Sequence, residues 1–178
     1  MQDFFFAAVR DLPSVPSNKC SATRGDRMDK EFFVQEIEKS GGMLYRIAYT
    51  ILRNNEDCRD ALQEAVLRAW EKRGTLRENA RFGTWLTRIL INECYNIQRK
   101  RRRIVPLEEA PEPSIPPPDP TLGLALRALP EKLRLPLVLQ YAEGMEYAEI
   151  ARILRLPEST VRGRIHRAKQ QLRKELEV

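Results

Sequence analysis

The chain has 178 residues, enough for one domain or two small ones, and its 31 basic and 25 acidic side chains give a formal net charge of +6. Three scattered cysteines are too few for a disulfide framework or a zinc site, and no apolar run approaches the roughly 18 residues that a membrane-spanning helix needs. We therefore expect a cytoplasmic protein with no metal, no cofactor and no membrane insertion. Its basic character suits a nucleic acid, but also an ordinary solvated surface.

The N-terminal part of the chain divides at Met28. Residues 1–27 contain prolines, serines and a glycine that break any periodicity, so we expect either a flexible extension there or a natural start at Met28. From residue 29 to 53, apolar residues recur at helical spacing. The pair Gly41-Gly42 interrupts this pattern, which predicts two helices rather than one.

Two further helices carry polar rows on the side away from their apolar faces. They are expected from residue 56 to about 72 and from about 84 to 103, with a polar loop at 73–81 between them. The row on the first consists of Asp60, Gln63 and Glu64. The row on the second consists of Arg88, Asn92, Asn96, Arg99 and Lys100. Such rows suit a binding partner, and they are also typical of solvated helix faces.

Residues 105–120 contain seven prolines and no basic residue. Proline at this density excludes helix and sheet and predicts an extended, semi-rigid linker. We place a domain boundary here, between a domain at 28–104 and a second domain at 121–178. No alternating strand pattern occurs, so the predicted fold is all-α, with two small helical domains joined by a proline-rich, acidic linker.

The second domain is expected to end in a helix-turn-helix. Short helices at 121–129 and 131–143 come first, the latter closed by Gly144. Residues 147–154 then place apolar side chains at i, i+3, i+4 and i+7, and a break at Arg155-Leu156-Pro157 precedes another amphipathic helix. Two short helices with a tight turn, the second presenting small, polar and basic residues, indicate DNA binding. An ordinary amphipathic hairpin has the same periodicity.

A basic helical domain, an acidic proline-rich linker and a C-terminal helix-turn-helix together resemble the extracytoplasmic-function (ECF) sigma factors of bacterial RNA polymerase. Residues 57–70, DCRDALQEAVLRAW, are similar to region 2.2 of that family. Residues 82–92 and the basic run from Arg99 resemble regions 2.3 and 2.4, and segments between residues 128 and 168 resemble region 4. The resemblance implies a transcription initiation factor that binds core RNA polymerase and directs it to a promoter with −10 and −35 elements.

The resemblance also implies roles for particular residues. The residues implied to contact the clamp helices of the polymerase's largest subunit are Asp60, Gln63 and Glu64. Those at the −10 element are Arg88, Asn92, Asn96, Arg99 and Lys100, and the loop 73–81 receives a flipped base. Those at the −35 element are Ser159, Thr160, Arg162, Gly163, Arg164, His166 and Arg167. The polymerase flap and an anti-sigma factor are further partners in this family, and no catalytic residue is implied.

Three positions depart from the family's usual pattern. Asn96 stands where aspartate is frequent, so the local pairing with Arg99 can change. Arg155 stands where a glycine is common in the turn, and arginine is strained there if the turn needs a positive φ. Ser159 also replaces a frequent glycine and adds a hydroxyl that can face DNA.

Two other functions remain open from the residues alone. One is a helix-turn-helix regulator whose N-terminal domain senses a ligand or dimerises. The other is an enzyme, such as a nuclease or recombinase. An enzyme needs converging carboxylates or an activated nucleophile, and neither pattern is evident, so we expect no catalytic activity.

Overall fold

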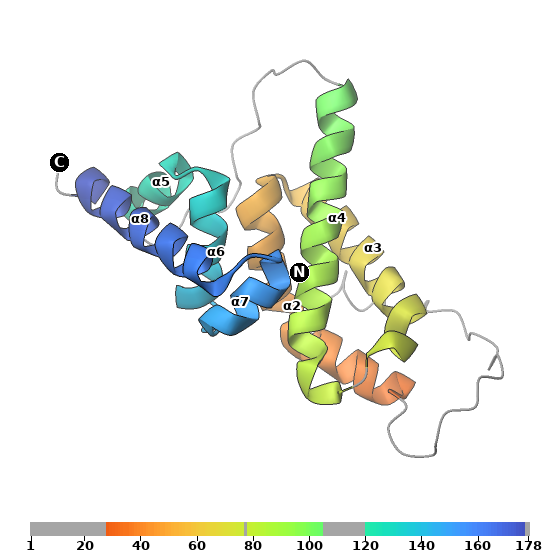
Figure 1. The fold of residues 1–178 in the computed structure, drawn as a ribbon. Helices are drawn as coiled ribbons and strands as arrows, with labels where there is room; N and C mark the ends of the chain where they lie inside the picture. The colour runs from red at the N-terminus through yellow and green to blue at the C-terminus, as the bar shows by residue number, and fades with distance from the viewer. Residues whose placement is uncertain (1–27, 77, 105–119, 177–178) are drawn as a thin grey trace.

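The computed structural model describes residues 28–76, 78–104 and 120–176 (Figure 1). Within these ranges every regular element is a helix, which confirms the all-α prediction. The expected extension at 1–27 and all but the last residue of the expected linker lie outside the described residues. That last residue, Pro120, begins a helix, a position where the missing N–H of proline costs no hydrogen bond.

The first part of the chain forms a bundle of three long helices, α2 (Lys30–Leu52), α3 (Asn55–Lys72) and α4 (Phe82–Ile104). The bundle has an aromatic centre, where the Phe33 ring lies 5.1 Å from that of Trp70 and 5.6 Å from that of Phe82. Cys58 and Cys94 are fully buried in the same core. The apolar faces of α3 and α4 are thereby turned inward, which leaves their polar rows outside.

The connection between α3 and α4 contains two short 3-10 helices, η1 (Arg73–Thr75) and η2 (Asn79–Arg81), where the sequence predicted only a polar loop. The Arg73 guanidinium lies 4.0 Å from the centre of the Trp70 ring and donates to the Trp70 carbonyl at 2.7 Å. The start of the connection is therefore fastened to the end of α3.

The prediction of two helices across Gly41-Gly42 is wrong, because α2 runs through both glycines without a break. Asp29 caps its start by accepting from the Phe32 amide at 2.7 Å. Ile37 and Leu44, on either side of the glycines, are both fully buried, and their spacing of about two turns puts them on one face. Burying two such side chains contributes about 3–6 kcal/mol, which exceeds the roughly 2 kcal/mol that two interior glycines cost.

The last part of the chain forms three short helices, α5 (Pro120–Ala128), α6 (Glu131–Tyr141) and α7 (Tyr147–Leu154), and one long helix, α8 (Glu158–Leu176). They pack around α8, with Leu139, Ile150 and Val161 fully buried. The third of the four begins after Gly144, whose φ of 67° reverses the chain. The preceding helix, α6, ends at Tyr141, slightly before the predicted end at residue 143.

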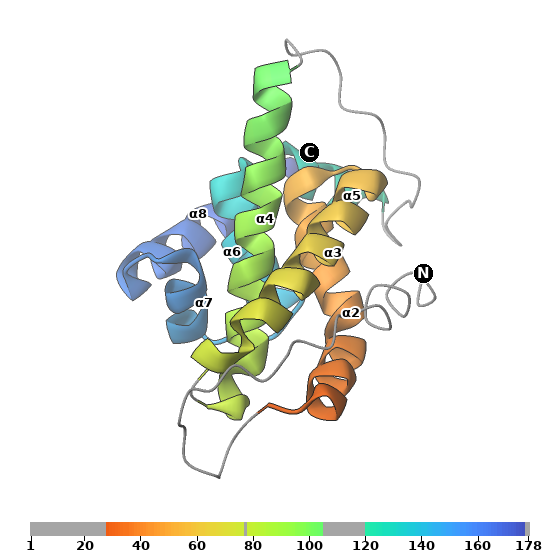
Figure 2. The same ribbon diagram turned by 90° about the vertical axis from the view of Figure 1, so that its right-hand side faces the viewer.

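The two groups of helices pack against each other, α6 on α2 and α7 on α4 (Figure 2). The buried Arg134 of α6 donates to the Thr50 carbonyl of α2 and to the Leu129 carbonyl, each at 2.9 Å. Burial among uncharged carbonyls lowers the pKa of Arg134 to about 10. On the other side, the Thr84 hydroxyl donates to the Glu149 carboxylate at 3.4 Å. The sequence did not predict this contact.

Candidate nucleic-acid interface

The polar row on α3, made of Asp60, Gln63 and Glu64, is exposed as predicted, and we refer to it as the α3 row. Asn54 fixes the start of the helix by accepting from the Asp57 amide at 3.0 Å. The opposite face of α3 is buried in the bundle. The α3 row is therefore a small acidic and amide surface on a helix that is held on its other side.

The polar row on α4 consists of Arg88, Asn92, Asn96, Arg99 and Lys100, which we refer to as the α4 row. Asn92, Arg99 and Lys100 are exposed, whereas Arg88 and Asn96 are partly buried. The C-terminal end of α4, which carries the basic residues, extends beyond the neighbouring helices (Figures 1 and 2). Cations at a helix C-terminus are favoured by the helix dipole, so the same residues also stabilise the helix.

Asn96, which stands where the family often has aspartate, still pairs with Arg99. The Asn96 Oδ1 accepts from the Arg99 Nη2, while the Asn96 Nδ2 donates to the Glu93 carboxylate at 3.0 Å. Sequence reasoning missed Glu93, which is 5% exposed. The available signal was its helical spacing with Leu90 and Ile97 on the apolar face of the predicted helix, where an acidic side chain needs a partner.

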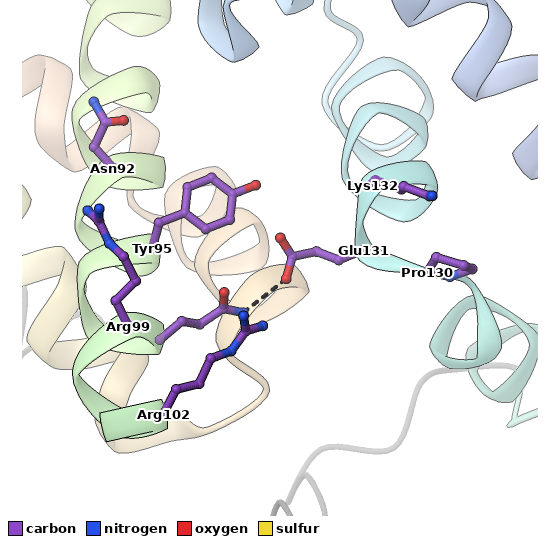
Figure 3. A pocket seen from close by; sticks show the side chains of 8 residues that line it. Asn92, Tyr95, Arg99, Arg102, Pro130, Glu131 and Lys132 are labelled. Atoms are coloured by element: carbon purple, nitrogen blue, oxygen red, sulfur yellow. Dashed lines mark hydrogen bonds between the residues drawn. The ribbon is translucent and has the colours of Figure 1, made fainter. Parts of the chain in front are cut away.

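A pocket of about 650 Å³ opens beside the α4 row, between α4 and the start of α6 (Figure 3). Asn92 and Arg99 line it together with Tyr95. From the opposite wall Glu131 points toward α4 and accepts from the Gln98 amide at 2.9 Å. Burial, with the Glu131 carboxylate nearby, raises the pKa of Tyr95. The structure thus places two residues of the α4 row opposite the second group of helices.

The turn between α7 and α8 has a positive φ at Arg155, the condition under which the sequence analysis expected strain there. Arg155 has a φ of 53° and a ψ of 46°, in the left-handed region. Its amide donates to the Ala151 carbonyl, and so does the Leu156 amide, at 3.0 Å. A non-glycine residue in this conformation costs about 1 kcal/mol, and the two hydrogen bonds close the end of α7 in return.

The polar surface of α8 consists of Ser159, Thr160, Arg162, Gly163, Arg164, His166 and Arg167, and we refer to it as the α8 face. Thr160, Gly163 and Arg164 are partly buried, and the other four are exposed. The Arg162 guanidinium donates to Glu158 at 2.6 and 3.1 Å and lies 4.5 Å from the centre of the Tyr147 ring. Arg167 donates to the Gly163 carbonyl at 3.2 Å. Arg162 and Arg167 are therefore held close to their own helix, and Arg162 also contacts α7.

Models of two sigma factor segments match the chain: Sigma-70 region 2 over residues 37–104 and Sigma-70 region 4 over residues 121–172. The ECF RNA polymerase sigma factor SigM of Mycobacterium tuberculosis is 32% identical over 154 residues, covering 81% of this chain and 76% of that protein. The chain belongs to the ECF sigma factors of RNA polymerase. SigW of Bacillus subtilis, another ECF sigma factor, is 29% identical over 169 residues, covering 83% of this chain and 90% of that protein.

Two solved structures have a similar fold. RpoE of Bartonella quintana, in complex with the anti-sigma factor NepR, has a TM-score of 0.70 and 26% identity, covering 82% of this chain and 97% of that one. CnrH, in complex with the cytosolic domain of CnrY, has a TM-score of 0.63 and 21% identity, covering 99% and 96%. The second likeness bears on the fold alone.

The sequence left three functions open: an initiation factor, another helix-turn-helix regulator and an enzyme. Membership of the ECF sigma factors favours the initiation factor. The region 2 segment carries the α3 row and the α4 row, and the region 4 segment carries the α8 face. A second pocket, of about 580 Å³, is lined by residues of both rows in region 2, Asp60 and Glu64 on one side and Asn96, Arg99 and Lys100 on the other. The structure thus brings the α3 row and the α4 row together at one pocket.

Among the described residues, no helix is long and apolar enough to cross a membrane. The same residues hold no group of three or more histidine, cysteine or acidic side chains placed to bind a metal ion.

Proposed function

We propose that this ECF sigma factor binds core RNA polymerase through the α3 row and reads its promoter with two separate helix surfaces. The α4 row contacts the −10 element and the α8 face contacts the −35 element. The α3 row contacts the clamp helices of the largest polymerase subunit, and region 4 contacts the flap. The protein acts in the cytoplasm, has no catalytic activity of its own, and consists of domains at 28–104 and 121–178.

One observation carries this proposal: each polar surface lies on a helix whose opposite face is buried in a core. A surface held in this way loses little conformational freedom when a partner binds, so more of the interaction energy appears as affinity. The carboxylates of Asp60 and Glu64 suit a basic protein partner and accelerate encounter with it. Amide and guanidinium groups on α4 and α8 suit base edges and phosphates.

The test is transcription in vitro with core polymerase and the full chain, on a promoter with both elements. Asp60→Ala is expected to weaken binding to core polymerase about tenfold without unfolding the protein, an order typical of losing one interface charge. Arg167→Ala is expected to weaken transcription that depends on the −35 element and to leave core binding unchanged. Equal core affinity in the first variant, or equal −35 dependence in the second, would contradict the assigned contact.

An anti-sigma factor is the regulatory partner that we propose for this chain. The proposal is supported by RpoE of Bartonella quintana, which was solved with the anti-sigma factor NepR and aligns with 82% of this chain. Such a partner should compete with core polymerase for the full chain in a binding assay. Simultaneous binding of both would argue against inhibition by exclusion.

A further inference from the structure

A buried carboxylate, Glu93, joins the two rows of region 2. Its side chain is 6% exposed. One carboxylate oxygen, Oε1, forms an ion pair with the Arg68 Nη1 at 2.9 Å, and the other, Oε2, accepts from the Asn96 Nδ2 at 3.0 Å. We propose that Glu93 is a positioning residue that orients Asn96, and through it Arg99, for the −10 element. The inference rests on the proposed role of the α4 row.

The contacts decide which way the Asn96 amide points. An ionised carboxylate can only accept hydrogen bonds, so Glu93 requires the NH₂ group of Asn96. The Asn96 Oδ1 then faces the other way and accepts from the Arg99 Nη2. Both ends of the amide are engaged within the protein. Of these two residues, the exposed Arg99 is therefore the one that presents donors to DNA, and Asn96 holds it in place.

The same carboxylate connects this arrangement to α3. Arg68, which forms the ion pair with Glu93, also donates through its Nε to the Glu64 Oε1 at 2.8 Å. A continuous series of ion pairs and charge-assisted hydrogen bonds thus runs from Glu64 of the α3 row to Arg99 of the α4 row. The side chains of this series line the pocket of about 580 Å³ between the two helices.

The energetic cost of burying Glu93 indicates that this carboxylate orients its partners rather than stabilises the fold. Removing a carboxylate from water costs several kcal/mol, and its partners offset that cost rather than exceed it. An apolar side chain of similar size would hold α3 and α4 together equally well. A buried charge with directional partners, in contrast, sets the orientation of the groups that bind it.

A second ion pair between α3 and α4 provides the matched control. The Arg101 Nε lies 2.8 Å from the Asp57 Oδ2 in an ion pair, and the Asp57 side chain is 13% exposed. This pair ties the same helices together without touching Asn96. If Glu93 only ties the helices together, Glu93→Leu and Asp57→Asn should behave alike.

The experiment measures transcription by the holoenzyme from a promoter with its natural −10 element and from single-base variants of that element. Glu93→Leu is expected to lower transcription from the natural promoter about tenfold and to reduce discrimination among the −10 variants, the size expected for one misplaced charge-assisted hydrogen bond. Its affinity for core polymerase should stay within about twofold of the unsubstituted protein, because Glu64 of the α3 row keeps its own hydrogen bond from the Arg68 Nε. Asp57→Asn should leave −10 discrimination unchanged.

Combination with Arg99→Ala separates this inference from the proposed function. If Glu93 acts through Arg99, Glu93→Leu causes no further loss in the Arg99→Ala background, since the two effects are not additive within one network. Additive losses, or an equal loss on every −10 variant, overturn the positioning role while the α4 row keeps its function. If Arg99→Ala alone leaves −10 dependence unchanged, the function proposed for the α4 row fails, and the inference fails with it.

Thermal unfolding of each variant shows whether it folds. If Glu93→Leu does not fold, Glu93→Gln replaces it, because it keeps the volume and removes the charge. That variant should lose transcription in the same direction by about threefold, as expected for a weaker hydrogen bond of one partner. Unchanged −10 discrimination in a folded Glu93→Gln variant overturns the proposal.

Discussion

Arg46 and Glu143 are joined by two hydrogen bonds, of 2.9 and 2.7 Å, although 97 positions separate them in the chain. The guanidinium belongs to α2 in region 2, and the carboxylate follows α6 in region 4. The Glu143 side chain is 2% exposed, whereas that of Arg46 is 57% exposed. This pair and the buried Arg134 hold the two regions against each other.

Arg46→Ala should therefore destabilise the protein. It leaves a buried carboxylate without its partner, and because the arginine itself is half exposed, we expect a loss of only about 1–2 kcal/mol in the free energy of unfolding. Urea denaturation followed by circular dichroism measures this loss. Lys39→Ala, which removes the exposed pair with Glu36, is the control and should change stability by less than about 0.5 kcal/mol. Equal stability of the two variants would mean that the contact between the regions is weak.

Arg155→Gly should stabilise the helix-turn-helix. Glycine adopts the left-handed conformation without strain, so the free energy of unfolding should rise by about 0.5–1 kcal/mol. Arg53→Gly is the matched control, since Arg53 has a φ of 54° but also donates to the Arg127 carbonyl at 2.7 Å. Losing that hydrogen bond should cancel the gain there. Urea denaturation compares the two, and a loss of stability in Arg155→Gly would show that the arginine side chain has a role in the turn.

Gly163→Ala should raise the stability of the protein but weaken transcription that depends on the −35 element. A Cβ at this position would meet no atom within 4 Å, so alanine should stabilise α8 by about 0.5–1 kcal/mol. The same methyl group would stand on the α8 face, where it should weaken transcription that depends on the −35 element. Thermal unfolding and transcription in vitro measure the two effects.

Gly42→Ala is the control for the thermal unfolding and transcription measurements on Gly163→Ala. It lies inside α2, where a Cβ would make an ordinary contact of 3.5 Å with Arg46. It should raise stability to a similar degree and leave −35 dependence unchanged. Unchanged −35 dependence in Gly163→Ala would instead indicate that DNA does not approach the backbone of α8 there.

The thiol of Cys58 should be unreactive in the folded protein. Burial raises its pKa from 9.0 to about 12, so at pH 8 the native thiol is protonated and shielded, and iodoacetamide should label it only after unfolding in urea. As pH rises from 9 toward 12, the unfolded state releases this proton before the folded state does, and the contribution of the thiol to stability therefore falls. Mass spectrometry of the labelled peptide measures the reaction, and rapid native labelling would show that α3 opens.

The periodic pattern of the sequence was enough for most of the helices. Apolar positions at a spacing near 3.6 residues, with capping and breaking residues, predicted α3, α4, α7 and α8 closely, since these signals act over one or two turns. The same local reasoning was wrong at Gly41-Gly42. There, the core contacts of Ile37 and Leu44 with other helices outweigh the weak local preference against glycine.

The sequence by itself determined the helical class, the family resemblance and which faces of α3, α4 and α8 are polar, because each of these follows from residue type at helical spacing. Only the tertiary structure decided that Arg46 meets Glu143, that region 4 packs on region 2, and that Glu93 lies between Arg68 and Asn96. Contacts of this kind depend on the relative placement of separate helices. No periodicity within one helix encodes that placement, so the partners of a buried charge become known only when the helices are brought together.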